Sequence, residues 1–489
     1  MIWAFDSLWV HRNGGHLYRL TDTDGDDQLD KAETIPGGTG GGEHGNHAVI
    51  VTEDGEGLYL DGGNHAPLGE YAGSRVTSWD EDLLLPRMWD ARGHARGKLA
   101  PGGWVTRLNI ENNEQTVYTI GFRNQYDIDR NRFGDVFTYD ADMEWDLGLP
   151  WYRPTRICHV ASGTDYGWRS GSGKWPAYYE DSAPPVIDIG PGSPTGVVSG
   201  KGTAFPSRYQ DALFALDWTF GTIYAIHLKP DGASYKATAE PFTFGSPLPV
   251  TDAIVGKDGA LYFAIGGRGA QSALFRVRYI GNESTAPPTD IDPAAAEARK
   301  QRRQLEAFHG VQDDQAVATA WPFLDSEDRF LRNAARVAIE SQTPDSWAQR
   351  VFSEVSPQAK VTAAVALART YALTFIRLGA PTEAERQAVI RQIDPLLPTS
   401  DADINTELIR VLTYLKAESV IAKTMALIEQ RSTPEIPDWS TLASRNARYG
   451  GTVNELLKNH PPTKEIGYAF ILRNMRQGWT IPQRKAYFT

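Results

Sequence analysis

The stretch DGALYF, Asp258 to Phe263, places a glycine-bearing turn directly before an apolar–aromatic pair. Turn residues followed by aromatic or branched residues are typical of the start of a β-strand. The same arrangement occurs in NGGHLY, GEGLYL, FGDVFTY and GTIYAI, with the pairs at Leu17-Tyr18, Leu58-Tyr59, Val136-Phe137 and Ile223-Tyr224. Successive pairs are 41, 78, 87 and 38 residues apart, close to one or two multiples of about 40. Short strands at this period predict a β-propeller over residues 1–280, with a generic all-β domain as the alternative.

Composition sets this region apart from the rest of the chain. Of the 46 glycines, 39 lie in residues 1–280, as do ten of the 14 tryptophans. A polar, proline-bearing linker over residues 281–298 leads into sequence rich in Ala, Leu, Arg and Glu, where apolar residues recur at helical spacing. Residues 299–489 are therefore predicted to be all-α, either as the antiparallel helix pairs of a HEAT-like solenoid or as an irregular helical domain.

Two stretches illustrate the helical pattern. In SPQAKVTAAVALARTYA, Ser356 is expected to cap a helix that begins at Pro357. In DADINTELIRVLTYLKAES, one apolar face of a helix is formed by Ile404, Leu408, Leu412 and Leu415.

The bulk properties of the 489 residues exclude several classes of protein. A net charge of −12 argues against a general nucleic-acid binder, and no stretch approaches the roughly 18 apolar residues of a membrane span. The N-terminus MIWAFDSLWVHRNGG lacks a basic flank and a clean apolar run, so it is not a signal peptide. The one cysteine, Cys158, is expected to be buried and inert. The chain starts inside a strand-like segment and stops without a helix stop signal, so we expect a fragment of a longer protein.

An acidic stretch, DTDGDDQLDKAE, has the spacing of an EF-hand calcium loop. Carboxylates occupy positions one, three, five, nine and twelve, and position seven offers its backbone carbonyl. The six predicted ligands are Asp22, Asp24, Asp26, Gln28, Asp30 and Glu33. Position six, which is normally glycine, is Asp27. Hard oxygen ligands favour Ca²⁺ over transition metals, so the loop is predicted to bind a structural calcium ion, the alternative being a solvated acidic loop.

Three histidines and a glutamate surround the strand that follows the glycine run GGTGGG. Glu43, His44 and His47 lie just before this apolar strand, and His65 lies just after the next one. Because strand ends of a propeller converge on its central channel, we expect these imidazoles to meet there. Histidine is the usual general base near neutral pH and a frequent metal ligand. The alternative is that they are merely exposed loop residues.

Charged residues mark two later stretches. GFRNQYD places Arg123 and Asn124 at a strand entry, where a guanidinium can bind an anion or a quinone oxygen. FTYDADMEWD has an acidic residue at every second position, namely Asp140, Asp142, Glu144 and Asp146. In an extended chain these charges share one face and repel each other unless a bulge splits them or a counter-charge holds them. Candidate bidentate partners are Arg132, Arg153 and Arg156.

Long stretches of residues 1–280 resemble one bacterial family. They include DEDLLLPRMWDARGHARGKLAPGGW, GFRNQYDIDRNRFGDVFTYDADMEWD, DIGPGSPTGV and DGALYFAIGGRGAQSALFRV. In these stretches the chain is similar to the membrane-bound dehydrogenase-like proteins of planctomycetes and verrucomicrobia. Those proteins look like distant relatives of the soluble glucose and sorbosone dehydrogenases, which are six-bladed propellers that use pyrroloquinoline quinone (PQQ) and Ca²⁺. The resemblance implies a six-bladed propeller that is N-terminally truncated in this chain.

The resemblance also extends past the linker. EAFHGVQDDQAVATAWPFLDSEDRFLRNAARVAIESQTPDSW resembles the HEAT-like region that follows the propeller in this family. Many members continue into a cytochrome domain that binds haem c through C-x-x-C-H, a motif that RICH, with Cys158 and His159, does not provide. The family implies a periplasmic or cell-envelope location.

The resemblance assigns roles to individual residues. EHGNHAVIVTED matches the segment that carries the catalytic histidine of the sugar dehydrogenases, which makes His44 the base for the substrate hydroxyl while hydride passes to the quinone. Arg123 and Asn124 match residues that contact the quinone. The resemblance also makes Arg123 a candidate catalytic residue. Asn64 matches an aspartate that orients the histidine, and an amide stabilises an imidazolium less than a carboxylate does. The expected cationic contacts of the cofactor are Lys201 and Arg268.

The acidic stretch YDADMEWD lies where the sugar dehydrogenases place their cofactor-side calcium loop. The resemblance therefore makes its four acidic residues candidate ligands of a divalent cation, while pairing with arginine stays open as the alternative.

Together these observations predict a PQQ-dependent dehydrogenase that oxidises a sugar or alcohol and passes electrons to a cytochrome. The alternative is a propeller that binds a carbohydrate or glycan without catalysis, with helical repeats that dock another protein, as the scaffold of a haem-binding protein. Quinone- and Ca²⁺-dependent dye reduction would mark the enzyme, and saturable glycan binding without cofactor would mark the binding module.

Overall fold

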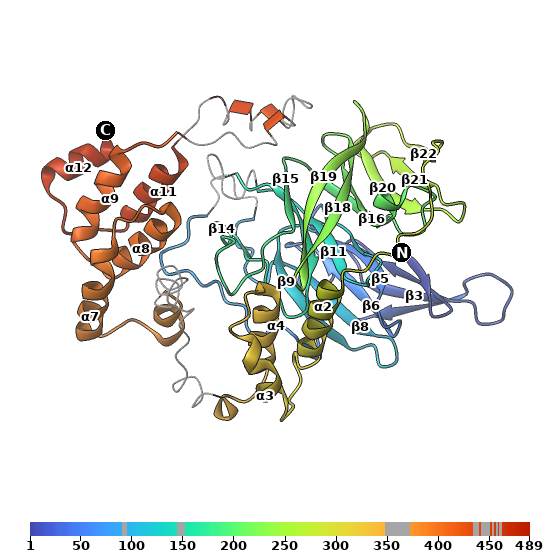
Figure 1. Cartoon of the computed structure of the whole chain (residues 1–489), viewed down its shortest axis with the longest axis horizontal. Coiled ribbons are helices and arrows are strands. Elements are labelled where there is room, and N and C mark those ends of the chain that lie inside the picture. Colours follow the sequence, from blue (N-terminus) through green and yellow to red (C-terminus); the bar gives the residue numbers. More distant parts are fainter. Residues whose placement is uncertain are drawn as a thin grey trace.

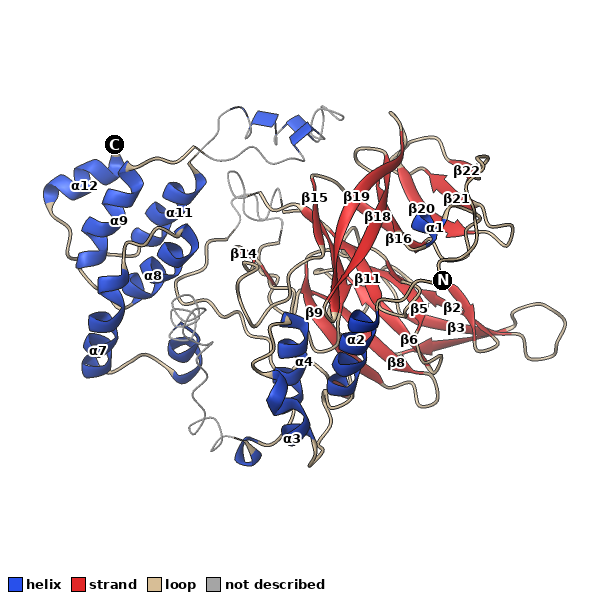
Figure 2. Ribbon diagram, viewed as in Figure 1, coloured by secondary structure: helices blue, strands red, loops and turns tan. Residues whose placement is uncertain are grey.

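A computed structural model describes residues 1–89, 95–143, 152–347, 372–433 and 462–489, with short pieces at 440–441, 450–451, 454–455 and 458. The described chain consists of a set of β-sheets, a pair of helices against them and a separate group of helices (Figures 1 and 2). The predicted cap Ser356 and the predicted ligands Glu144 and Asp146 lie outside the described residues.

The β-sheets are the blades of a propeller. Blade 1 contains β1 (Ile2–Ala4), β2 (Ser7–His11), β3 (Leu17–Thr21) and β4 (Lys31–Ile35). Blade 2 contains β5 (Asn46–Val51), β6 (Gly57–Gly62), β8 (Gly103–Asn109), β9 (Gln115–Phe122) and β7 (Gly73–Ser74). Blade 3 contains β10 (Ile128–Arg130), β11 (Val136–Asp140), β12 (Thr155–Val160) and β15 (Ile187–Gly190). Blade 4 contains β16 (Pro194–Ser199), β17 (Leu213–Asp217), β18 (Thr222–Asp231) and β19 (Ser234–Phe244). Blade 5 contains β20 (Val250–Val255), β21 (Leu261–Ile265) and β22 (Ala273–Val277).

The propeller is confirmed, but the described residues form five blades and not the predicted six. Each of the five turn-plus-pair stretches supplies one strand, in β3, β6, β11, β18 and β21, so the repeats mark one strand per blade. Within the described residues the two double spacings hold no additional blade. The described residues 63–89 and 95–102 belong to the long connection from β6 to β8, and residues 161–186 carry a two-stranded ribbon, β13 (Trp168–Arg169) and β14 (Gly173–Lys174). The sixth blade came from the family resemblance alone.

The first strands of the blades lie next to one another around the propeller axis. β10 packs beside β5 and β16, β16 packs beside β20, and β1 and β2 pack beside β5. Within each blade the strands are antiparallel, except that β7 joins β9 in parallel. Buried aromatic and aliphatic residues fill the spaces between blades, among them Trp9 and Trp104 between blades 1 and 2 and Phe214 and Phe263 between blades 4 and 5. Burial of this apolar area is the main stabilising term of such a fold.

Two helices pack against the outside of the propeller. α2 (Pro293–Glu306) begins at the N-cap Asp292, inside the predicted linker, and α4 (Arg329–Glu340) packs on it, with the short α3 (Ala316–Ala320) between them. Asp135 of the propeller accepts hydrogen bonds from Arg302 Nη2 at 2.5 Å and Arg303 Nη2 at 3.0 Å. Burial alone would raise the pKa of Asp135, but these arginines outweigh it and hold the pKa far below its usual range. The remaining short elements here are α1 (Ser207–Gln210) and the 3-10 turns Trp321–Phe323 and Pro344–Ser346.

A second group of helices follows at the C-terminal end, at the left of Figure 1. It contains α7 (Glu383–Ile393), the 3-10 turn Asp394–Leu396, α8 (Ala402–Tyr414), α9 (Ser419–Glu429), α11 (Thr463–Leu472) and α12 (Ile481–Phe488). The predicted apolar face is confirmed, since Leu408, Leu412 and Leu415 are buried in its core and Ile404 packs against them. In the described residues α11 packs on both α8 and α9, so these helices form a cluster, and the HEAT-like solenoid stays a prediction. No described helix has the length and apolar character that a membrane crossing requires.

Candidate functional site

His44 is held by Asn64 at one end of blade 2. The residue precedes β5, is 3% exposed, and its Nδ1 lies 2.5 Å from Asn64 Oδ1. Because a carbonyl oxygen only accepts, Nδ1 is the protonated nitrogen and Nε2 carries the lone pair. The structure thus brings together the imidazole and the amide that the sequence predicted to be partners.

Backbone hydrogen bonds join the loops that surround this pair. Asn64 N donates to Arg123 O at 2.8 Å, and His65 N donates to His44 O at 3.1 Å. The loops precede β5, follow β6 and follow β9, which end on the same side of blade 2 because the strands are antiparallel. Gly63 is required here, since a Cβ atom would lie 2.3 Å from Asn124 Oδ1. The glycine lets the two loops approach closely enough to position His44.

The other two predicted histidines join the same cluster. The ring centroids of His44 and His65 are 4.6 Å apart. His47 Nε2 donates to Asn124 Oδ1 at 2.8 Å, and burial lowers the pKa of His47 to about 4, so this imidazole is neutral at neutral pH. Asn124 Nδ2 in turn donates to Glu43 O at 3.1 Å. The expectation that the loop histidines meet is confirmed, and both amide atoms of Asn124 are engaged within the protein.

Asp140 fixes the Arg123–Asn124 segment from behind. Asp140 Oδ1 accepts the backbone N–H of Arg123 at 2.9 Å and of Asn124 at 3.0 Å. Asp140 Oδ2 lies 3.0 Å from Arg156 Nε and 3.1 Å from Lys174 Nζ. Burial would raise the pKa of Asp140, but the two cations outweigh it and keep the pKa below its usual value. Asp140 is therefore a buried, ion-paired anchor.

The described part of the acidic stretch shows the protein partners of its first two carboxylates. β11 ends at Asp140, and Asp142 turns to other partners, accepting from Tyr152 OH at 2.9 Å and Gly192 N at 3.3 Å. Asp140 and Asp142 thus have different protein partners, and a common cation for the acidic stretch stays a prediction. Of the predicted arginines, Arg156 pairs with Asp140, whereas Arg132 pairs with Asp211 at 2.7 Å. Lys174 was not predicted, because 34 residues separate it from Asp140 in the sequence.

The residues predicted to bind a quinone differ in their contacts and exposure. Arg268 forms an ion pair with Glu43 at 2.5 Å and lies over the ring of Trp218. Lys201 is exposed at the turn after β16, and Arg123 is buried. An anionic quinone needs uncompensated cations or free donors. Arg268 and both amide atoms of Asn124 already have protein partners, so the binding of a quinone by these residues stays a prediction.

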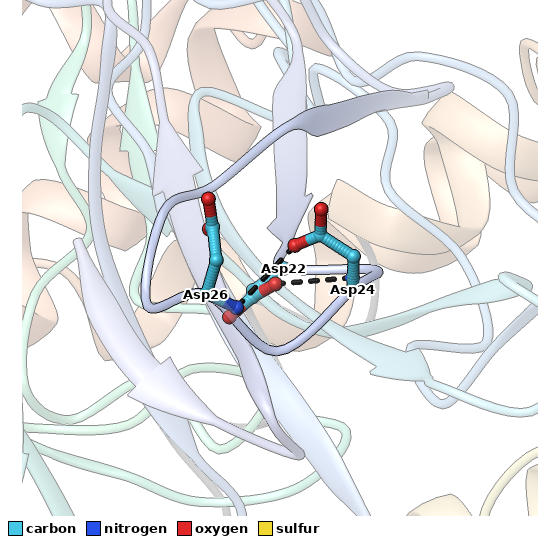
Figure 3. A group of neighbouring side chains, drawn as sticks. All are labelled: Asp22, Asp24 and Asp26. Atoms are coloured by element: carbon cyan, nitrogen blue, oxygen red, sulfur yellow. Dashed lines mark hydrogen bonds between the residues drawn. The ribbon is translucent and has the colours of Figure 1, made fainter.

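The predicted calcium loop is the exposed hairpin between β3 and β4 (Figure 3). Carboxylate oxygens of Asp22, Asp24 and Asp26 all lie within 4.8 Å of one another. Asp27 adopts φ +64°, the left-handed conformation for which glycine normally serves at this position. The turn is therefore made without the glycine.

Two of the other predicted ligands of this loop have different partners. Asp30 accepts from Thr23 Oγ1 at 2.6 Å, and Glu33 pairs with Lys31 at 2.8 Å on β4. Ca²⁺ takes about six to eight oxygen ligands, and the described loop gathers three carboxylates, so a calcium ion here stays a prediction.

Two further carboxylates lie close in sequence to the His44 cluster, Asp61 near the end of β6 and Asp127 directly before β10. Asp61 Oδ1 accepts Ala48 N at 2.5 Å, and Asp127 Oδ2 accepts Val197 N at 2.9 Å. Burial raises the pKa of Asp61 and of Asp127 well above their usual value, and their mutual repulsion adds to the shift of Asp61. Asp127 thereby bridges β10 of blade 3 to β16 of blade 4. Sequence analysis did not single out these two residues, because an isolated aspartate in a strand carries no pattern.

The fold and this cluster define a β-propeller with a histidine–amide pair at one end of a blade. No protein-family model matches the chain, and no curated protein matches it. Among solved structures it is similar to an oxidoreductase described as a glucose dehydrogenase from Thermus thermophilus, with 18% identity, a TM-score of 0.37, and coverage of 53% of this chain and 74% of the other. It is also similar to the PQQ-bound form of aldose sugar dehydrogenase from Streptomyces coelicolor, with 14% identity, a TM-score of 0.37, and coverage of 55% and 73%.

A third likeness is to a periplasmic gluconolactonase from Pseudomonas aeruginosa, with 13% identity, a TM-score of 0.26, and coverage of 58% and 69%. None of these proteins belongs by its description to the planctomycete and verrucomicrobial family, so membership of that family, the haem domain and the location in the cell envelope stay predictions.

Proposed function

We propose that this chain binds a sugar or related alcohol at the end of blade 2, where the imidazole of His44 accepts a hydrogen bond from a substrate hydroxyl. The observation that carries the proposal is the 2.5 Å contact between His44 Nδ1 and Asn64 Oδ1. The contact fixes the ring with Nδ1 toward Asn64, and in this proposal Nε2 accepts from the ligand. A sugar hydroxyl is the complementary donor.

The same geometry limits how strong a base His44 can be. A general base must lie within hydrogen-bond reach of the proton it takes, and a partner that stabilises the resulting imidazolium increases its strength. Asn64 fixes the ring but brings no negative charge. His44 therefore polarises the hydroxyl more readily than it removes the proton.

Oxidation of that hydroxyl with a quinone is the second candidate function. It is favoured by the position of Arg123 and Asn124, whose backbone is anchored on Asp140 directly beside the Asn64 loop. The engaged state of Asn124 and Arg268 argues against it, and no step through a quinone follows from these contacts. Electron transfer to a cytochrome and the docking of a protein by the helices also stay predictions.

Isothermal titration of the purified chain with glucose, with and without PQQ and Ca²⁺, tests the proposal. We expect saturable binding without cofactor and a loss of binding in His44→Ala, with Asn64→Ala weakening binding because the ring loses its fixed orientation. Thr77→Ala, an exposed change near the helices, is the control that should leave affinity unchanged. Binding that is unaffected by His44→Ala would refute the proposal, and dye reduction that depends on the quinone would establish the second candidate.

A further inference from the structure

A cavity of about 200 Å³ lies where the linker and α2 meet the propeller. Its walls come from the turn between β10 and β11, from β18 and β19, and from the residues that precede α2. Arg132 fastens the linker over this cavity, because it donates to Pro288 O at 3.0 Å and to Asp290 O and pairs with Asp211. A cavity of about 150 Å³ can bind benzene, so this one is large enough for a small organic molecule.

Arg299 of α2 brings a buried positive charge to the wall of this cavity. The residue is 5% exposed, and its guanidinium lies over the ring of Phe133, 4.3 Å from the centroid. Its Nε is 3.9 Å from Asp135 Oδ2, which is beyond hydrogen-bond distance, and among the described residues its Nη1 has no hydrogen-bond partner. An unpaired buried charged donor is unfavourable, so a ligand that supplies an acceptor gains from the contact.

Asp135 does not complete the contacts of Arg299, because it is shared with other cations. Its Oδ1 accepts from Arg302 Nη2 at 2.5 Å and from Arg303 Nη2 at 3.0 Å. The carboxylate of Glu306 pairs with Arg302 at 3.3 Å. Two carboxylates therefore face three arginines in this part of the interface. A ligand carboxylate would balance the third charge, since a carboxylate is flat like a guanidinium and can pair with it in bidentate fashion.

The remaining walls favour an apolar body with a positive end. Phe133, Leu228 and Pro230 supply carbon surface, and Asp290 and Asp292 lie on the exposed side of the cavity. The carboxylate of Asp292 caps the first turn of α2, so Asp290 is the acidic group left to attract a cation there.

We propose that this cavity binds a small apolar amino acid. Its carboxylate pairs with Arg299, its side chain packs against Phe133 and Leu228, and its ammonium group faces Asp290. A simple acid or a simple amine of the same size would engage only one end of the cavity. The site is built from residues other than those of the His44 cluster, and it does not depend on the function proposed for that cluster.

Three ligands with one carbon skeleton test the assignment, namely leucine, 4-methylpentanoate and 3-methylbutylamine. In isothermal titration of the full chain we expect leucine to bind most tightly and 4-methylpentanoate about threefold more weakly, because it lacks the attraction to Asp290. The amine should not bind measurably, because it has no carboxylate for Arg299. Equal affinity of leucine and 4-methylpentanoate would overturn the amino-acid assignment. Binding of the amine as tight as that of leucine, or no binding by either carboxylate, would overturn the site.

Substitutions in the wall test which residues hold the ligand. Arg299→Met should abolish leucine binding, whereas Arg303→Met removes another arginine contact of Asp135 without altering the cavity wall and should keep the affinity within about twofold. Leu228→Trp fills the cavity without changing any charge and should also abolish binding. Thermal unfolding followed by circular dichroism separates lost binding from lost folding in each variant. Wild-type affinity for leucine in a folded Arg299→Met or Leu228→Trp protein would overturn the proposal.

Discussion

Two acidic clusters of this chain have nearly the same sequence pattern and opposite surroundings. Asp140 ends a buried strand and is 0% exposed, with Arg156 and Lys174 around it. Asp22, Asp24 and Asp26 lie in an exposed hairpin loop and interact with backbone N–H groups of that loop. A buried carboxylate must have counter-charges from its own chain, because desolvation would otherwise neutralise it, whereas an exposed one can keep its charge in water or bind an ion. The same spacing of aspartates therefore predicts different chemistry according to burial.

The largest effect is expected from removing a counter-charge in the buried cluster. Arg156→Leu leaves Asp140 with Lys174 alone and removes the donor to Tyr166 O, so the free energy of unfolding should fall by about 3–5 kcal/mol. Denaturant unfolding measures this loss. Lys31→Met, which breaks the exposed pair with Glu33, is the matched control and should leave unfolding unchanged. An equal loss of unfolding free energy in the two variants would contradict the claim that the buried carboxylate depends on its counter-charges and the exposed one does not.

The buried carboxyls Asp140 and Asp61 should respond to acid in opposite ways, because their pKa values are shifted in opposite directions. The pKa of Asp140 is lowered in the fold, so its contribution to stability is present above the usual value of 3.8 and is lost as the pH falls through the folded pKa. The pKa of Asp61 is raised, so this group lowers stability as the pH rises above 3.8 toward the folded pKa. Asp61→Asn should therefore raise the free energy of unfolding at pH 7, with the gain shrinking toward pH 4. A gain that does not vary with pH would contradict this assignment.

The smallest effect is expected from calcium at the exposed loop. If the loop binds the ion, millimolar Ca²⁺ should raise the melting temperature slightly, and a chelator should reverse the rise. Asp24→Asn should abolish the response, while Asp54→Asn, on the neighbouring hairpin, should not. Differential scanning calorimetry measures both. A melting temperature that does not respond to Ca²⁺ would leave the cluster as a solvated acidic loop.

The sequence predicts the propeller well because its signal is local. Each turn-plus-pair stretch specifies one hairpin, and one such stretch falls in each blade. The blade count failed where it relied on resemblance, since insertions such as residues 63–102 lengthen a spacing without adding a sheet. The His44–Asn64 pair was found because a family pattern joined residues 20 positions apart.

The sequence could not predict Lys174 or Tyr126 as partners of the site, because their contacts depend on the tertiary fold. Lys174 meets Asp140 only because the β13–β14 ribbon folds back on blade 3, and the ring of Tyr126 stacks on His47 only because the loop after β9 lies against the start of β5. Neither contact leaves a periodic trace in the sequence. The nearest usable signal was GFRNQYD itself, where alternation places Tyr126 on the same side of the chain as Asn124.

The contacts of Asp135 show where the chain cannot be truncated without loss of stability. The composition changes at residue 280, yet the carboxylate in blade 3 depends on arginines that lie beyond that point, at 302 and 303. A propeller that ends at residue 280 would lack Arg302 and Arg303. Asp135 would then be a buried carboxylate without these two counter-charges. A cut anywhere between residue 280 and Arg303 would therefore remove counter-charges that this buried carboxylate needs.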